Sequence, residues 1–309
     1  MTRVVSIGEC MIELIEDEQG NVRRGWGGDT LNTAVYMARS LDRSSFEVAY
    51  LTALGDDPFS QQMVDGWQAE GVDTQAVLRL PGKLPGLYAI RTDARGDRSF
   101  YYWREQAAVR ALFTHEEGAH ARRVLREAAM VYLSGITLAI LPPASREMLI
   151  DNLAQARGRG ARVAFDPNYR ARLWPTKEEA RGWQKKLLSV VDIALPTHED
   201  EHHLWGDVTA EATGARLLEA GLDHIVVKNG EAPTLVATHE GMHTIPLERV
   251  VTPIDTTGAG DSFNAAYLSG LLRDATPTAA VRAGQRLAAQ VVQHRGAIMP
   301  REAHPDPGP

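Results

Sequence analysis

Short, near-continuous apolar runs alternate along the chain with longer amphipathic segments. Apolar runs of this kind, ending in Gly, Asp, Pro or Lys, are typical of strands buried on both faces of a parallel sheet. The predicted strands are RVVSIG, VAYLTALG, MVYLSG, RVAFD, DIALP and HIVVK. Helices are predicted near residues 58–70, 116–128, 144–157, 177–190 and 210–220. The alternation indicates an α/β fold, in which ligands bind outside the carboxyl ends of the strands.

One region departs from this alternation. The strand-like runs GLYAIRT and RSFYYWR flank DARGD, which predicts a β-hairpin with a glycine-containing loop. A period of two places aromatic side chains on both faces of the second run: Phe100, Tyr102 and Arg104 on one, and Ser99, Tyr101 and Trp103 on the other. We therefore expect this hairpin to be covered on both sides, as in a lid or a dimer contact.

Composition and charge narrow the function classes. Of 309 residues, 44% are hydrophobic and 24% charged, which is ordinary for a soluble protein with a sizeable core. The net charge of −7, without a long basic run, gives no electrostatic signature of nucleic-acid binding.

The same sequence predicts a cytoplasmic protein with no membrane partner. The single cysteine, Cys10, rules out an intrachain disulfide framework and is expected to be a small buried residue of the first strand. The amino-terminal residues lack the pattern of a signal peptide. The longest apolar stretch, AAMVYLSGITLAILPPA, is too interrupted by polar residues, glycine and proline to span a bilayer.

Candidate chemistry is concentrated in residues 254–270, IDTTGAGDSFNAAYLSG. From Asp261 onward the apolar residues lie on one helical face, so the glycines directly precede a helix whose first N–H groups have no partner within it. Gly258 and Gly260 would let an anion approach those groups. Asp261 has two interpretations, a helix cap or a base beside a phosphate. The full TTGAGD run is more than a cap requires and favours the base.

No G-x-x-x-x-G-K-[ST] loop occurs in the chain. The residues instead resemble the carboxyl-terminal signature of the ribokinase-like (PfkB) carbohydrate kinases, and GGDTLNTAVYMARSL resembles the amino-terminal signature of the same family. The resemblance implies a three-layer α/β/α fold with a mostly parallel sheet and a small β-sheet lid. It implies one kinase domain over residues 1–302, with lid strands at about 14–27 and 84–105, followed by a tail, 303–309, that we expect to be disordered.

Finer strings, among them GECMIEL, LPGLY, FYYWR and DPNYRARLW, are similar to 2-keto-3-deoxygluconate kinases. That resemblance implies phosphoryl transfer from ATP to the terminal (6-) hydroxyl of the sugar acid, giving 2-keto-3-deoxy-6-phosphogluconate and ADP. A carboxylate beside a ketone calls for bidentate cationic recognition, which a neutral sugar does not need. Arg104 and Arg170 supply such groups.

The resemblance also assigns the site residue by residue. Asp261 is the catalytic base, and the backbone of Gly258, Ala259 and Gly260 forms the anion hole. The sugar acid is bound by Gly28, Tyr88, Tyr102, Arg104, Arg170 and Asp261. ATP is bound by Asn168, Arg170, Thr197, Lys228, Gly230, Gly258 and Gly260. Arg170 therefore has two candidate roles, toward carboxylate or phosphate.

The chain departs from the family at PTHED. Thr197 and Asp200 stand where many members have Asn and Glu of an N-x-x-E string. Mg²⁺ is implied by phosphoryl transfer from ATP, and Asp200 is expected to reach it through water.

Other interpretations remain open at this point. A kinase of the same fold acting on fructose or ribose is the nearest alternative, and a nucleotide-binding regulator without turnover is another. His198, Glu199 and His202 match H-E-x-x-H, the pattern of a zinc hydrolase, although the polar flanks favour a solvated helix start. The aromatic hairpin suggests a homodimer or higher homo-oligomer through the lid. The sequence does not separate gluconate-derived from galactonate-derived epimers.

Overall fold

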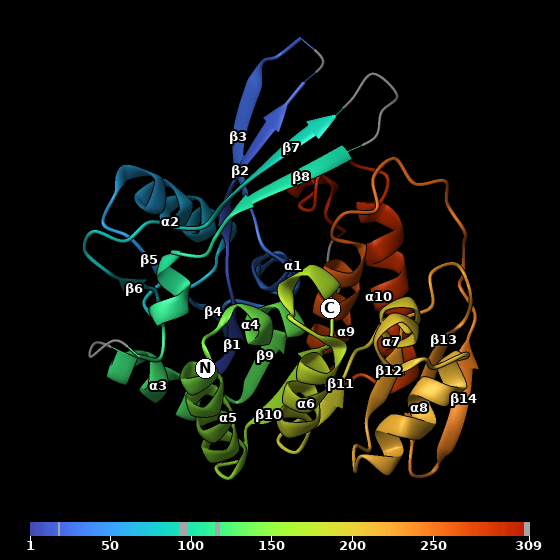
Figure 1. Cartoon of the computed structure of the whole chain (residues 1–309). Helices are drawn as coiled ribbons and strands as arrows, with labels where there is room; N and C mark the ends of the chain where they lie inside the picture. Colours follow the sequence, from blue (N-terminus) through green and yellow to red (C-terminus); the bar gives the residue numbers. More distant parts are fainter. Residues whose placement is uncertain (18, 93–97, 115–117, 306–309) are drawn as a thin grey trace.

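A computed structural model describes residues 1–17, 19–92, 98–114 and 118–305. Within these residues an eight-stranded sheet runs in the order β14-β13-β12-β11-β10-β9-β1-β4 (Figure 1). Neighbours from β4 to β12 are parallel, and β13 and β14 form an antiparallel edge. The strands are β1 (Thr2–Ile7), β4 (Phe46–Leu51), β9 (Met130–Ser134), β10 (Arg162–Asp166), β11 (Ile193–Ala194), β12 (Ile225–Val227), β13 (Thr234–Thr238) and β14 (Gly241–Ile245).

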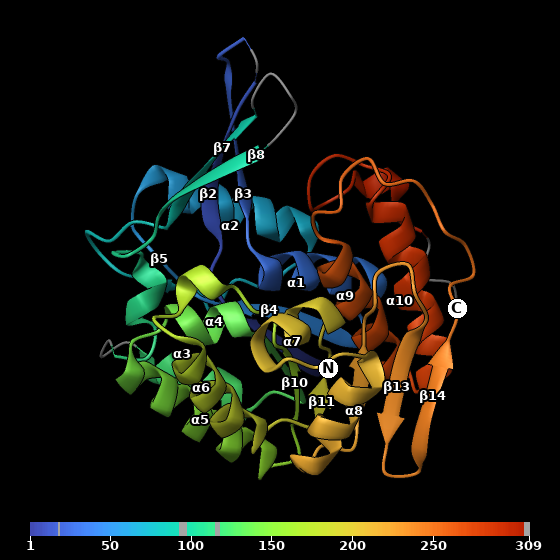
Figure 2. The ribbon, with the colours of Figure 1, turned by 45° about the vertical axis from the view of Figure 1, so that its right-hand side comes forward.

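Helices cover both faces of this sheet (Figures 1 and 2). Successive residues of a strand point to opposite faces, so the adjacent Val4 and Val5 of β1 belong to two separate hydrophobic cores. The core that contains Val5 is closed by α3 (Gly118–Arg126), α4 (Gly135–Ile140), α5 (Pro143–Arg157), α6 (Lys177–Leu188), α7 (His198–Trp205) and α8 (Ala210–Glu219). The core that contains Val4 is closed by α1 (Asp29–Ser40), α2 (Pro58–Glu70), α9 (Ala259–Leu272) and α10 (Pro277–Val291). The three-layer α/β/α prediction is confirmed.

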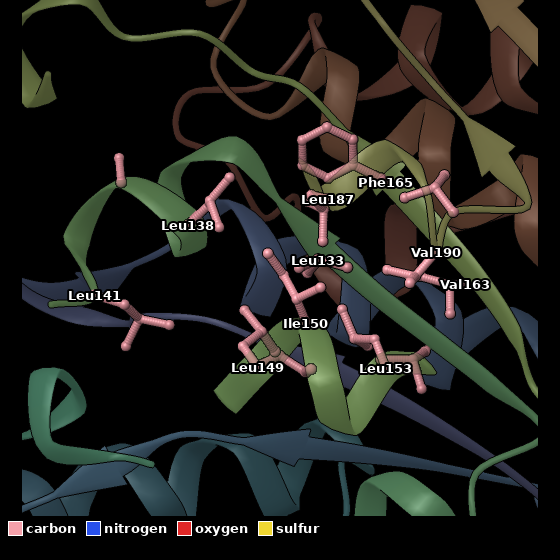
Figure 3. Packing of buried hydrophobic residues seen from close by; sticks show 14 of the residues in the cluster. Leu133, Leu138, Leu141, Leu149, Ile150, Leu153, Val163, Phe165, Leu187 and Val190 are labelled. Carbon is pink, nitrogen blue, oxygen red and sulfur yellow. The ribbon is translucent and has the colours of Figure 1, made fainter. Parts of the chain in front are cut away.

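Figure 3 shows part of the first core. Leu133 of β9, Phe165 of β10, and Leu149 and Leu153 of α5 all belong to this core, and all four are fully buried. Burying a side chain of this size stabilises the fold by about 1.5–3 kcal/mol. This packing fixes the strands whose carboxyl ends carry the polar residues described below.

A smaller sheet, here called the lid, stands away from the layers (Figure 2). Its order is β3-β2-β7-β8, with β2 and β7 parallel and the outer pairs antiparallel. Its strands are β2 (Met11–Glu16), β3 (Val22–Gly27), β7 (Leu87–Thr92) and β8 (Arg98–Trp103). The predicted hairpin is confirmed in its strands, whereas its DARGD loop lies outside the described residues. On one face of β8, Tyr101 and Trp103 are 51% and 62% exposed.

Short elements complete the described chain. They are β5 (Ala53–Leu54) and β6 (Leu78–Arg79), which pair with each other, and the 3₁₀ turns η1 (Ala108–Ala111), η2 (Ala171–Leu173) and η3 (Arg301–Ala303). After η3, His304 stacks on Tyr36 with ring centroids 6.0 Å apart, and residues 306–309 of the predicted tail lie outside the described residues. No helix in the described ranges is long and apolar enough to cross a membrane.

Local signals explain why the helix predictions succeeded. For α2, the Asp57 carboxylate accepts from the N–H groups of Phe59 and Ser60, and Pro58 occupies the first helical position. Gly71 ends the helix with a φ of 90°. The structure adds elements that were not predicted: β6, β13, β14, α4 and α10. The end of β2 and all of β3 fall within the lid range expected at about 14–27.

Candidate active site

The predicted anion cradle lies at the amino end of α9. Gly258 is the cap residue, with a φ of 77°, and a Cβ there would lie 2.5 Å from the carbonyl oxygen of Ala297. Both observations require glycine. The Lys228 ammonium lies 3.7 Å from where a Cβ of Gly260 would stand, so a positive charge adjoins the helix end. The Ala259 N–H donates to the Thr256 carbonyl oxygen at 3.3 Å, so its place in the anion hole stays a prediction.

Asp261 lies in the first turn of the same helix, half-buried. The amide of Asn32, on α1, donates to its Oδ2 at 2.8 Å. Burial, together with the nearby charges of Asp29 and Asp166, raises the pKa of Asp261 to about 7, against the lowering effects of Asn32 and Lys228. A carboxylate with such a pKa can both accept and release a proton near neutrality.

A buried polar network lies beneath the cradle. The Asp166 carboxylate, at the end of β10, accepts from the Lys228 ammonium at 2.6 Å and from the Asn264 amide at 2.7 Å. Lys228 also donates to Asn264 Oδ1 at 3.0 Å. Asp166 ends β10, Lys228 directly follows β12, and Asn264 lies on α9, so the network fixes three elements relative to one another.

Asn168 connects this network to α1. Its backbone has a φ of 34°, a left-handed conformation that asparagine tolerates better than most residues. Its N–H donates to Asp166 Oδ1 at 3.1 Å, and its side-chain amide donates to Asp29 Oδ2 at 2.7 Å. The amide is thus already engaged, and its predicted contact with ATP stays a prediction.

Four of the predicted sugar-binding residues lie together on and beside the lid. The Arg104 guanidinium donates to Glu9, and both side chains are nearly buried, 11% and 2% exposed. Desolvation raises the pKa of Glu9, and Arg104 opposes this effect. Tyr88 donates to Glu13 and stacks on Tyr102 with ring centroids 5.8 Å apart. Burial and the neighbouring Glu13 raise the pKa of Tyr88.

Gly28 belongs to the same group. A Cβ at Gly28 would collide with the backbone of Glu9, so the chain entering α1 passes directly against the residue that binds Arg104. Gly28, Tyr88, Tyr102 and Arg104 are thus neighbours. Each stays a predicted sugar contact.

Several predicted nucleotide-binding residues lie near Lys228, a member of the buried polar network. Thr197 pairs with Lys228 in a parallel bridge, and Gly230 follows with a φ of 58°. Arg170 Nη1 lies 3.3 Å from Asp200 Oδ1 and donates to the Tyr169 carbonyl oxygen at 2.8 Å. Desolvation raises the pKa of Asp200, against the effect of Arg170. Arg170 is therefore paired with Asp200, and its two candidate roles, toward carboxylate or phosphate, stay predictions.

Known proteins resemble the chain over nearly its full length. The sequence profile of the pfkB family carbohydrate kinases matches residues 1–304. The chain belongs to the pfkB family of carbohydrate kinases. It is 47% identical over 306 residues to 2-dehydro-3-deoxygluconokinase of Escherichia coli K12, covering 98% of this chain and 99% of the relative. It is 44% identical over 305 residues to the protein of that name from Dickeya dadantii, covering 98% of each.

A solved structure shows the same fold. The crystal structure of a putative ribokinase II from E. coli, in complex with ATP and Mg²⁺, superposes with a TM-score of 0.82 at 21% identity. The match covers 99% of this chain and 97% of that one. The expected ribokinase-like fold of the pfkB family, with its separate small sheet, is thereby confirmed.

The H-E-x-x-H residues of this pfkB chain lie on α7, where the rings of His198 and His202 are 6.4 Å apart between centroids. His202 Nδ1 lies 2.8 Å from the Asp207 carbonyl oxygen. Among the residues that the structure describes, no three His, Cys, Asp or Glu side chains are grouped so as to hold a metal ion. The motif therefore has no third ligand in the described chain.

Sequence reasoning missed several side chains of this pfkB site. They are Glu9, Glu13, Asp29, Asn32, Asp166 and Asn264. Most share one signal, a polar residue at the end of a buried strand or within the first two turns of a helix. Such a residue is retained in a core only where it has partners.

Proposed function

We propose that the protein transfers the γ-phosphoryl group of ATP to the 6-hydroxyl of 2-keto-3-deoxygluconate, also called 2-dehydro-3-deoxygluconate. The products are 2-keto-3-deoxy-6-phosphogluconate and ADP. The observation that carries the proposal is the 47% identity, over nearly the whole of both chains, to a relative named for this activity. The raised pKa of Asp261 beside a glycine-rich helix start supports the same chemistry.

In the proposed step, Asp261 takes the proton of the 6-hydroxyl as that oxygen bonds to the γ-phosphorus. The bond from the γ-phosphorus to the bridging oxygen breaks, and the electron pair stays on ADP. The backbone of Gly258, Ala259 and Gly260, with the adjacent Lys228 ammonium, would stabilise the transferring group. Asn32 would hold the Asp261 carboxylate toward the hydroxyl.

The proposed nucleotide contacts are Asn168, Arg170, Thr197, Lys228, Gly230, Gly258 and Gly260. Mg²⁺ keeps most of its waters and takes few protein ligands beside substrate phosphates, which suits a contact through water with Asp200. Asp200 is engaged by Arg170, so we assign it a water-mediated contact. Bound Mg²⁺ would neutralise phosphate charge.

The proposed sugar contacts are Gly28, Tyr88, Tyr102, Arg104 and Asp261, with Arg170 on the nucleotide side. A neutral sugar, fructose or ribose, is the second candidate, since Arg104 is already neutralised by Glu9.

A coupled ADP-release assay with Mg-ATP would test the substrate, comparing 2-keto-3-deoxygluconate with fructose, ribose and gluconate. We expect kcat/KM for the keto acid to exceed the others by at least ~100-fold, the usual scale for losing a buried charged contact. Preference for fructose or ribose would reject the sugar acid and retain the kinase. Absence of ADP with every acceptor would reject the kinase.

The pKa of Asp261 predicts the pH profile. Below about 7 the carboxyl is protonated and cannot accept the hydroxyl proton, so kcat/KM should rise with pH through about 7 and then level off. Glu201 on α7 is a matched control, because burial raises its pKa to about 7 as well. Its carboxylate is paired with Arg216, away from the amino end of α9. Glu201→Gln should keep the rising limb, and Asp261→Asn should abolish it. If the rising limb were lost in Glu201→Gln, the limb would come from Glu201 and not from Asp261.

Two further assignments rest on exposure and composition. The outward Tyr101 and Trp103 of the lid form an aromatic surface that a second copy would cover, so we assign a homodimer or higher homo-oligomer through the lid. Sedimentation equilibrium showing the mass of one chain at micromolar concentration would reject this.

The lone thiol, Cys10, is buried and free, which suits the reducing cytoplasm.

A further inference from the structure

Arg172 connects the main domain to the lid. It lies in η2, directly after the polar turn that follows β10, and it is exposed. Its guanidinium carbon lies 3.9 Å from the centroid of the Tyr102 ring on β8. A cation over a ring face interacts through its charge, and this leaves its N–H donors for other partners.

The cations around the site differ in what they already bind. Arg104 is paired with Glu9, Arg170 with Asp200, and Lys228 with Asp166. Across the described residues no carboxylate oxygen lies within 4.0 Å of the Arg172 guanidinium. Among the cations named here, Arg172 is therefore the one whose charge is not balanced by a neighbouring acid.

Tyr102 brings two arginines together. The guanidinium carbon of Arg104 lies 5.9 Å from the centroid of the ring that Arg172 contacts, and the ring itself stacks on Tyr88. Arg104 and Glu9 form a neutral pair, so a bound carboxylate would be attracted by Arg104 and repelled by Glu9. A second, unpaired guanidinium at the same ring would make the local charge favourable to an anion.

We propose that Arg172 binds the carboxylate of the sugar acid and sets the preference for acids over neutral sugars. This rests on the proposed function. The guanidinium fork matches a carboxylate in bidentate geometry, and the Tyr102 ring holds it at the lid. Arg104, paired with Glu9, would contact the same sugar acid, and Arg170 would contact the nucleotide.

The test compares Arg172→Gln with the wild-type protein on two acceptors, 2-keto-3-deoxygluconate and its uncharged methyl ester, at saturating Mg-ATP. We expect KM for the acid to rise at least ~10-fold, because a charge-assisted hydrogen-bonded pair is lost, with kcat changed less than ~3-fold. KM for the ester should stay within ~2-fold. Arg172→Lys should recover part of the loss, since it keeps the charge without the fork.

Arg159→Gln removes one exposed arginine after the end of α5, whose guanidinium donates to the Gln155 carbonyl oxygen, and it should leave both KM values unchanged. Equal rises of KM for acid and ester in Arg172→Gln would make Arg172 a lid support and overturn the proposal, as would an unchanged KM for the acid. If the wild-type protein did not phosphorylate the acid at all, the proposed function would fail first.

Discussion

Asp261→Asn is expected to lower kcat by at least ~100-fold, the usual contribution of a positioned general base. An asparagine cannot take the hydroxyl proton, yet it keeps the size of the side chain and an oxygen that can accept from Asn32. The fold and ATP affinity should therefore change little. The measurement is single-turnover kinetics with Mg-ATP, alongside calorimetric binding of ATP.

The control for this variant is Asn32→Ala, which removes the amide that donates to Asp261 and leaves the carboxylate. It should reduce kcat by a smaller factor than Asp261→Asn, because the base is present but less well oriented. Turnover near the wild-type rate in Asp261→Asn would remove Asp261 from the mechanism, whatever the control did.

Lys228→Met is expected to lower the free energy of unfolding by about 3–5 kcal/mol, the usual cost of leaving one member of a buried ion pair alone. Asp166 would keep the side-chain amide of Asn264 and the backbone N–H of Asn168 as donors, but lose its only cation within 4.0 Å among the described residues. Urea unfolding followed by tryptophan fluorescence measures the loss. ATP affinity should fall as well, since the ammonium adjoins the cradle.

A double variant separates the charge from the packing. Lys228→Met combined with Asp166→Asn removes both charges, so it should be more stable than Lys228→Met alone. If the double variant were less stable than the single one by the full cost of Asp166→Asn, the two residues would not be coupled. The ion pair, 2.6 Å long, would then make no net contribution to the free energy of unfolding.

The parts of the site that local sequence encodes were predictable. Gly258, Gly260 and Asp261 form one run, and a glycine run followed by an acid and a helical period specifies a helix start with open N–H groups. The βαβ alternation likewise predicted the layers. Strands β13 and β14 were missed because they form an antiparallel edge that lies outside this alternation.

The parts that depend on distant pairing were not predictable. Asn32 and Asp261 are 229 positions apart, and Arg104 and Glu9 are 95 apart, so no local pattern links either pair. Arg172 stands in a polar, exposed stretch where an arginine is ordinary. Only the fold, by bringing β8 over the turn after β10, gives that arginine a neighbour.

The order of pairing in the lid has a consequence for how the chain is made. Ile12 of β2 pairs with Leu87 of β7 in parallel, with α1, β4 and α2 between them in the sequence. During synthesis β2 can pair with β3 at once, whereas β7 emerges only after the intervening elements. Closing so long a loop is slow, so the lid is added to a domain that is already partly built. The lid is thus among the last amino-terminal features to form.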